Sequence, residues 1–238
     1  MCWLMRQRFG SLTGVTAVDD GTYGGKGLRS ATTKLQNVEI AVGNWQDPNF
    51  MPNRQFDVVV ADYLIGATEQ HWKYGAGAMM NRVLRTVRPG GYLLFVGLEP
   101  YEMVLNRDKG SRDRLVLDIE TIGDTAAALA GESTYRELPE EWVINEIAAR
   151  KDFTVVNSQQ FQMRLTYGSM QNQLSYARTV ASKIDDSSLR AAYRKRIKSL
   201  EDQLKKSWPK KDVHTRARNY AIVVRRLSRV HYEYDKYE

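Results

Sequence analysis

The sequence predicts an α/β fold built on a mostly parallel sheet whose last strand is antiparallel. Residues 57–61 carry three consecutive valines and suit a strand covered on both faces, as the strands of parallel sheets are. A second apolar run follows at 92–96, after a helix and the Pro-Gly-Gly stop at 89–91. Strands are also expected at 14–18 and 38–42. The first three strands recur about every 20 residues, which leaves room for one short crossover helix each and implies right-handed parallel βαβ units.

The helix before the Pro-Gly-Gly stop has one apolar face, made by Met79, Met80, Val83, Leu84 and Val87. Proline lacks a backbone donor and glycine permits a chain reversal, so we expect residues 89–91 to end this helix. Residues 102–138 are polar and interrupted by glycines. They are expected to form an insertion with weak helical content near the ligand edge of the sheet, where such insertions act as lids or substrate loops.

The second half of the chain continues the alternation of helices and strands. Pro139 and the acids that follow it favour the start of a helix, and a strand is expected at 153–156. Two helices are expected at 169–183 and 187–207. Apolar residues recur with helical period in the second of them: Leu189, Ala192, Tyr193, Ile197, Leu200 and Leu204. The last strand, expected at 219–226, would insert into the sheet as its antiparallel member.

Composition narrows the class of protein. The chain has 238 residues and a single cysteine, Cys2, which excludes an internal disulfide and a cysteine-built metal site. No apolar run approaches the roughly 20 residues that span a bilayer. The apolar stretch of the N-terminal segment is too broken for a secretory signal. A cytoplasmic protein without a membrane or metal partner is expected, and an organellar signal stays open.

The net charge of +7 is unevenly distributed. Residues 183–229 hold 15 Lys and Arg against 5 Asp and Glu, so this segment carries +10 and the rest of the chain −3. Such a segment can attract nucleic acid or another acidic surface through its phosphates or carboxylates. The favoured alternative is that long helices display solvated lysines and arginines. No RNA-reading or DNA-reading motif accompanies the charge.

Five stretches together resemble the class I S-adenosylmethionine-dependent methyltransferases. They read, in chain order, VTAVDD, VGNWQDP, FDVVVADYLIGA, RPGGYLLFV and NYAIVVRR. The resemblance covers nearly the whole chain and implies a Rossmann-like sheet in a single domain over residues 1–238. Within that domain lie the insertion at 102–138 and a basic helical segment at 168–211.

The resemblance implies contacts to S-adenosylmethionine at the first two strand ends. Asp19 or Asp20 takes the place of the acid that binds both ribose hydroxyls, which a carboxylate can accept together. Asn44 stands where an aspartate commonly meets the adenine amino group, and its amide oxygen keeps an acceptor there. Trp45 is then placed to pack against the adenine ring. The alternatives are that an aspartate caps the next helix and that Trp45 belongs to the core.

The third strand end carries the rest of the implied site. Asp62 and Tyr63 match the position beneath the methionine part and the methyl donor, where negative charge favours the cofactor's positive charges. Asp62 as a structural strand-end cap is the alternative. His71 lies just past this strand and is a candidate to deprotonate a methyl acceptor, against the alternative of an ordinary histidine at a helix.

One family element is missing. The first strand of these enzymes ends in a glycine-rich loop that approaches the cofactor, and the 13 residues before the strand at 14–18 contain no such motif. Gly24, Gly25 and Gly27 follow the acid instead of preceding it. We therefore expect an N-terminally incomplete sheet. A shortened sequence is the favoured explanation; a strand supplied by a partner and a noncatalytic relative are the others.

The expected function is S-adenosylmethionine-dependent methyl transfer to a small-molecule acceptor, which can proceed by positioning alone. A noncatalytic scaffold or partner subunit, a nucleotide-dependent oxidoreductase, and an RNA-binding or RNA-methylating protein are the alternatives. The absent glycine fingerprint counts against the oxidoreductase and the methyltransferase alike, while the late helices and the final strand fit the methyltransferases better. The sequence assigns neither the acceptor nor the oligomeric state.

Overall fold

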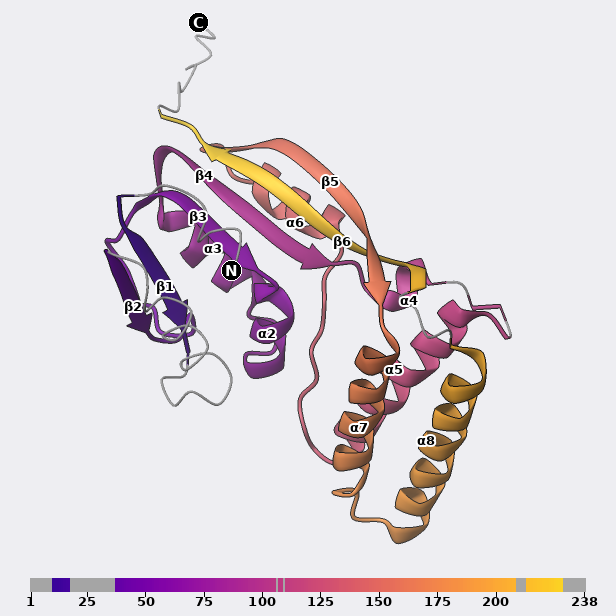
Figure 1. Ribbon diagram of the computed structural model, residues 1–238. Coiled ribbons are helices and arrows are strands. Elements are labelled where there is room, and N and C mark those ends of the chain that lie inside the picture. Colours follow the sequence, from indigo (N-terminus) through magenta and orange to yellow (C-terminus); the bar gives the residue numbers. More distant parts are fainter. Residues whose placement is uncertain (1–9, 18–36, 106, 109, 209–212, 229–238) are drawn as a thin grey trace, which may run out of the picture. The chain divides into compact units, whose positions relative to one another are not determined.

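The computed structural model describes residues 10–17, 37–105, 107–108, 110–208 and 213–228 (Figure 1). The chain divides into two compact units, residues 1–54 and residues 55–238. Asp19, Asp20 and the helix expected in the first crossover lie outside the described residues.

The first unit contains two parallel strands, β1 (Leu12–Thr16) and β2 (Val38–Val42). Their pairing confirms the parallel arrangement, although β1 begins two residues before the predicted strand. Arg54 contacts both strands: its guanidinium donates to both carboxylate oxygens of Glu39 in β2, at 2.6 and 2.5 Å, and to Thr13 Oγ1 in β1 at 3.4 Å.

The second unit is built on a four-stranded sheet with the order β3-β4-β6-β5 (Figure 1). The strands are β3 (Phe56–Asp62), β4 (Val87–Leu98), β5 (Phe153–Leu165) and β6 (Val213–Arg226). β3 and β4 are parallel, while β6 runs antiparallel to both β4 and β5. The prediction that the last strand inserts into the sheet as its antiparallel member is therefore confirmed.

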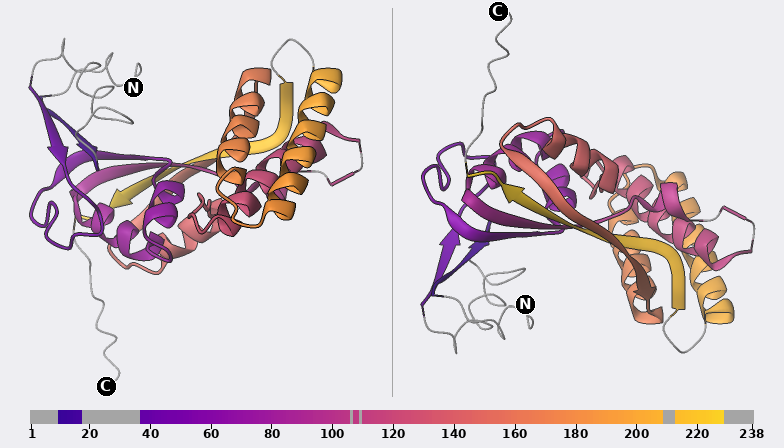
Figure 2. Two further views of the ribbon diagram at one scale, coloured as in Figure 1. Left: turned by 90° about the horizontal axis from the view of Figure 1, so that it is seen from below. Right: turned by 90° about the horizontal axis from the view of Figure 1, so that it is seen from above.

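Helices α3 (Ala76–Arg85) and α6 (Glu140–Ala148) cover one face of this sheet (Figures 1 and 2). The buried side chains of that face include Met79, Met80, Val83, Leu84, Leu93, Phe95, Val143, Ile147, Tyr220, Ile222 and Val224. The predicted apolar face of α3 is thus confirmed up to Leu84. Alternation along the strands fixes this set, since every second side chain of a strand points to the same face.

The opposite face of β3 differs from the prediction of a strand covered on both sides. Val58 is 60% exposed and Val60 is 38% exposed. Within the described part of the second unit, β3 pairs only with β4 and is an edge strand. A run of valines indicates a buried strand from its residue types alone, whereas exposure depends on which elements lie over each face.

The Pro-Gly-Gly segment does not end the preceding helix, as the sequence had predicted. α3 ends at Arg85, and the Thr86 hydroxyl donates to the Val83 carbonyl at 2.7 Å, closing the last turn. Residues 89–91 instead lie inside β4, where the pairing advances from Val87 to Tyr92 while β3 advances only from Phe56 to Val58. Gly90 adopts a φ of +79°, a conformation that glycine permits in such an irregularity.

A helical module completes the second unit. It consists of α5 (Arg112–Leu129), α7 (Tyr167–Ala181) and α8 (Ser187–Ser207), with the short α4 (Tyr101–Val104) beside it (Figure 1). The two late helices confirm the sequence prediction to within two residues. The prediction of weak helical content over 102–138 was wrong, because α5 is a continuous helix of 18 residues within this segment.

The three helices share one apolar cluster. α5 contributes Val116 and Ile119, α7 contributes Leu174, and α8 contributes Ile197 and Leu200. The helical period of the apolar residues in α8 places them on the side that faces this cluster. Ala192 is the exception among the predicted residues, because it is exposed. Among the described helices, none is both long enough and apolar enough to cross a bilayer.

Two buried glycines should respond in opposite ways to an added methyl group. A Cβ on Gly123 of α5 would meet Tyr176 and Ala177 at 3.5 to 3.8 Å, which is ordinary contact, so Gly123→Ala should stabilise the fold by about 1 kcal/mol through helix propensity. A Cβ on Gly97 of β4 would overlap the Tyr220 ring, so Gly97→Ala should cost about 1–3 kcal/mol. Urea unfolding of both variants checks the two signs, and a loss of stability in Gly123→Ala would contradict this packing of α5 on α7.

Candidate cofactor and substrate site

The carboxyl ends of β3 and β4 form one edge of the sheet. Asp62 is the last residue of β3, lies opposite Val96 of β4 and is exposed. The Tyr63 N–H donates to the Val96 carbonyl at 3.0 Å, so the pairing continues to the first residue after the strand. Glu99 follows β4 directly and Tyr101 opens α4. Ligands of open α/β sheets bind outside these strand ends.

Tyr63 holds an uncommon backbone conformation at this edge. Its φ and ψ of 48° and 36° lie in the left-handed region, and it caps the start of α2 (Leu64–His71) without a side-chain hydrogen bond to the helix. For a residue with a bulky side chain this conformation costs of the order of 1 kcal/mol. Such strained residues cluster at functional sites, which makes this turn a candidate for function.

Glu137 reaches the same edge from the segment that precedes α6. It lies against the first turn of α2, where a Cβ on Gly66 would overlap its Oε1. Its other carboxylate oxygen, Oε2, is buried and has no hydrogen-bond partner among the described residues. Burial raises the pKa of Glu137 to about 7. This carboxyl can therefore exchange a proton near neutral pH.

Flanking hydrogen bonds hold the Glu137 segment against the sheet. The Tyr220 hydroxyl donates to the Leu138 carbonyl at 2.9 Å. Glu99 is buried, and its Oε1 accepts from the Glu140 N–H at 3.1 Å and from Gln160 Nε2 at 3.3 Å. Gln160 of β5 also donates to Glu140 Oε2 at 2.6 Å. The residues that follow Glu137 are thus attached to Glu99, directly after β4, and to strands β5 and β6, which restricts the position of its carboxyl.

Two further ionisable groups complete what we call the strand-end cluster: Asp62, Tyr63, Tyr101, Glu120 and Glu137. Burial, followed by the charge of Glu120 and the proximity of Tyr63 and Glu137, raises the pKa of Tyr101 far above its usual range. Burial and the charge of Asp124 raise the pKa of Glu120, on α5, to about 7. The cluster therefore combines phenols that stay protonated with carboxyls that titrate near neutrality.

The cluster can perform two kinds of chemistry. Its carboxylates create a negative potential that favours a bound cation, and the faces of tyrosine rings attract cations as well. A carboxyl with a pKa of about 7 is also suited to act as a general base at neutral pH. The sequence had predicted Asp62 and Tyr63 at this edge, and Tyr101 lies near them, whereas Glu120 and Glu137 were not anticipated.

His71 lies at the far end of α2. It is the last residue of that helix and is exposed. Seven residues of helical rise separate it from Leu64, or about 10 Å along the axis. The structure therefore brings Glu137, and not His71, to the first turn of α2, and a catalytic role for His71 stays a prediction.

Asn44 and Trp45 belong to the first unit and follow β2. Asn44 Oδ1 accepts from the Gln46 N–H at 2.9 Å, which forms a turn typical of asparagine. Trp45 packs edge-to-face on Phe50, with ring centroids 5.2 Å apart and planes at 78°. Both residues thus lie at a strand carboxyl end, as the sequence predicted, while their contacts to a nucleoside stay a prediction.

The mostly parallel strands with an antiparallel last strand are consistent with the Rossmann-like methyltransferase fold. A provisionally assigned methyltransferase from Bacillus halodurans C-125 has a similar structure, with a TM-score of 0.53 over 90% of this chain and 82% of that one, at 11% sequence identity. The YcgJ protein of Bacillus subtilis is similar with a TM-score of 0.51, over 91% of this chain and 82% of that one, at 12% identity. No protein-family model and no curated protein matches the sequence.

Proposed function

We propose that this protein transfers a methyl group from S-adenosylmethionine to a small-molecule acceptor at the carboxyl edge of β3 and β4. The strand-end cluster is the observation that carries the proposal. A sulfonium nucleoside is a cation with an α-ammonium group, and carboxylates beside tyrosine rings are a fitting environment for both charges. The buried, unpartnered Oε2 of Glu137 supports the fit, because a buried acceptor without a donor favours a ligand that supplies one.

Within the second unit, Asp62 and Tyr63 hold the methionine part. The sequence-based assignments of Asn44 and Trp45 to the adenine and of Asp19 or Asp20 to the ribose stay predictions. When bound, S-adenosylmethionine supplies a methyl group on a sulfonium that is open to one-step displacement. The chain orients the acceptor nucleophile in line with that methyl group, which supplies much of the rate.

Glu137 is the proposed general base. Its carboxylate accepts the proton that the acceptor's hydroxyl or amine must lose as the new bond to carbon forms, and then releases it to solvent. The requirement is a deprotonated carboxyl, so activity should rise with pH through the pKa of about 7. His71 is the alternative base, and comparison of Glu137→Gln with His71→Asn separates the two.

Cofactor binding tests the proposal most directly. Calorimetry with S-adenosylhomocysteine should detect binding to the full chain, and Asp62→Asn should weaken it about tenfold or more because a charge-assisted contact is lost. Asp57→Asn is the matched control, since Asp57 lies at the opposite end of the same strand, where it pairs with Arg88 at 2.5 Å. Equal losses in both variants would contradict the assignment of Asp62.

A noncatalytic scaffold is the second candidate function. Under this alternative the wild-type chain would bind neither S-adenosylmethionine nor S-adenosylhomocysteine. Absent binding in a folded, monodisperse sample would therefore end the enzyme proposal.

A further inference from the structure

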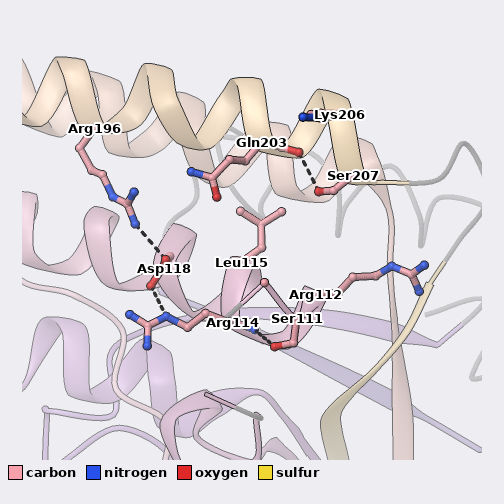
Figure 3. A pocket seen from close by; sticks show the side chains of 10 residues that line it. Ser111, Arg112, Arg114, Leu115, Asp118, Arg196, Gln203, Lys206 and Ser207 are labelled. Atoms are coloured by element: carbon pink, nitrogen blue, oxygen red, sulfur yellow. Dashed lines mark hydrogen bonds and ion pairs between the residues drawn. The ribbon is translucent and has the colours of Figure 1, made fainter. Parts of the chain in front are cut away.

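The helices α5 and α8 enclose a basic cavity that the proposed methyl transfer does not use. The cavity has a volume of about 720 Å³, and its lining includes Arg112 and Arg114 from α5 and Arg196 and Lys206 from α8. Figure 3 shows side chains of α5 on one wall and those of α8 on the other, with Leu115 between them. Four cations face one carboxylate, that of Asp118, so the lining carries a net charge of +3.

The ion pairs of the cavity leave much of this charge uncompensated. Asp118 accepts from Arg114 Nε through Oδ1 and from Arg196 Nη2 through Oδ2, both at 2.8 Å (Figure 3). One carboxylate thus serves two guanidiniums. Arg112 and Lys206 are exposed and form no ion pair with another described residue. Guanidinium groups are suited to phosphate, because their donors match its oxygens in pairs.

A second cavity extends the basic surface along α8. Its volume is about 430 Å³, its lining includes Lys195, Lys198 and Asp202, and it shares Gln203 and Lys206 with the first cavity. Asp202 pairs with Lys198 at 3.0 Å, so the charge of Lys195 adds to the basic surface. From Lys195 to Lys206 the helix rises about 16 Å, or three turns. A single phosphate would occupy one of the two cavities, whereas a chain of phosphates can follow both.

The surroundings favour a polynucleotide over a membrane. The large apolar side chains of α8 are buried or half-buried, including Leu189, Tyr193, Ile197, Leu200 and Leu204. An interfacial helix would need such side chains on its outer surface to enter the lipid. No exposed aromatic ring of α8 is available to stack on a base, so recognition would rest on the backbone.

We propose that the α5–α8 groove binds the phosphodiester backbone of single-stranded nucleic acid, without sequence preference. The structural basis is the excess of cations over two adjoining cavities, six against the two carboxylates of Asp118 and Asp202, with Gln203 and Ser207 as additional polar groups in the lining of the first. Binding of this kind is strongest at low salt, because each neutralised phosphate releases condensed counterions. The site needs no bound cofactor.

A double variant in which two cations are neutralised tests the proposal through the salt dependence of RNA binding. Binding of a labelled 12-nucleotide RNA to the full chain is measured by fluorescence anisotropy from 50 to 200 mM salt. Arg112→Gln with Lys206→Gln should lower the slope of log K against log salt by about 1.4 and weaken binding at 50 mM salt on the order of 50-fold. Circular dichroism confirms that the variant is folded.

Arg85→Gln with Lys151→Gln is the matched control. Both residues are exposed and lie at the amino-terminal side of the strands. The two substitutions remove two positive charges, as Arg112→Gln with Lys206→Gln does. This control should keep the wild-type slope. Absent RNA binding at 50 mM salt, or an equal loss in both double variants, would overturn the proposal in favour of nonspecific charge.

Asp118→Asn provides a test of opposite sign. Removing the carboxylate frees Arg114 and Arg196 for the ligand, so RNA binding should tighten and its salt slope should steepen. Unchanged or weaker binding in the folded variant would count against the groove. Poly-glutamate and vesicles of anionic lipid serve as competitors, and displacement of RNA by either at equal charge concentration would overturn the assignment to nucleic acid.

Discussion

Replacing Glu137 with glutamine should abolish most methyl transfer and, at the same time, stabilise the fold above pH 7. A general base contributes about 100-fold to 10,000-fold in rate, so Glu137→Gln should lose at least about 100-fold in kcat/KM. Wild-type kcat/KM should rise with pH and level off above the pKa of about 7, whereas the variant should show no rise there. Release of S-adenosylhomocysteine in the presence of an acceptor found by screening is the measurement.

The stability effect follows from the direction of the pKa shift. Burial raises the folded-state pKa of Glu137 from its ordinary 4.5 to about 7, so the folded protein binds more protons than the unfolded chain between these values. Wild-type stability therefore falls as pH rises from about 4.5 to about 7, and stays lowered above it. Glutamine has no charge to bury, so the free energy of unfolding at pH 8 should exceed that of the wild type.

Glu120→Gln is the matched control for this pair of effects. Glu120 has the same residue type and a pKa that burial also raises to about 7. It influences Tyr101, while Glu137 lies at Gly66 in the first turn of α2. Glu120→Gln should therefore share the gain in stability at pH 8 and keep the rise of kcat/KM with pH, because Glu137 still supplies the base, while the loss of a carboxylate from the cluster weakens cofactor binding. Loss of that rise in both variants would mean that the whole cluster acts through its charge, without a single base.

Periodicity made the helices and most of the sheet predictable. The spacing of Ile197, Leu200 and Leu204 identified α8, and the run that contains Tyr220 identified the last strand. Asp62 and Tyr63 were predictable because a strand end can be located from sequence, and parallel strands end at one edge. Such patterns involve residues that are close together in the chain, so the sequence alone shows them.

Glu137 could not be predicted, because its properties arise from contacts distant in sequence. A glutamate in a polar stretch before a helix is ordinarily solvated. Its burial depends on the approach of Gly66, more than 70 residues away, and on the bond from Tyr220 to Leu138. The one local indication was the glycine at position 66, whose missing side chain permits the close approach. α5 was missed for a similar reason, since Gly123 reads as an interruption until α7 lies against it.

Phe95→Ala should be the most destabilising single substitution in the sheet, with a loss of about 3–5 kcal/mol. Phe95 of β4 is fully buried and lies opposite Ala61 of β3 and Ile222 of β6, which are buried as well. Removing the ring leaves a cavity across three strands that the rigid backbone pairing cannot close. Urea unfolding followed by circular dichroism measures the loss.

Tyr92→Ala, on the other face of the same strand, is the control that separates loss of a buried ring from loss of an exposed one. Tyr92 is 39% exposed and lies opposite Val58 and Arg225, whose guanidinium is 5.8 Å from the centre of its ring. Loss of a partly exposed ring and one cation–π contact should cost about 1 kcal/mol. If Tyr92→Ala instead cost as much as Phe95→Ala, the face that carries Val58 and Val60 would have to be covered in solution, and β3 would be a buried strand on both sides after all.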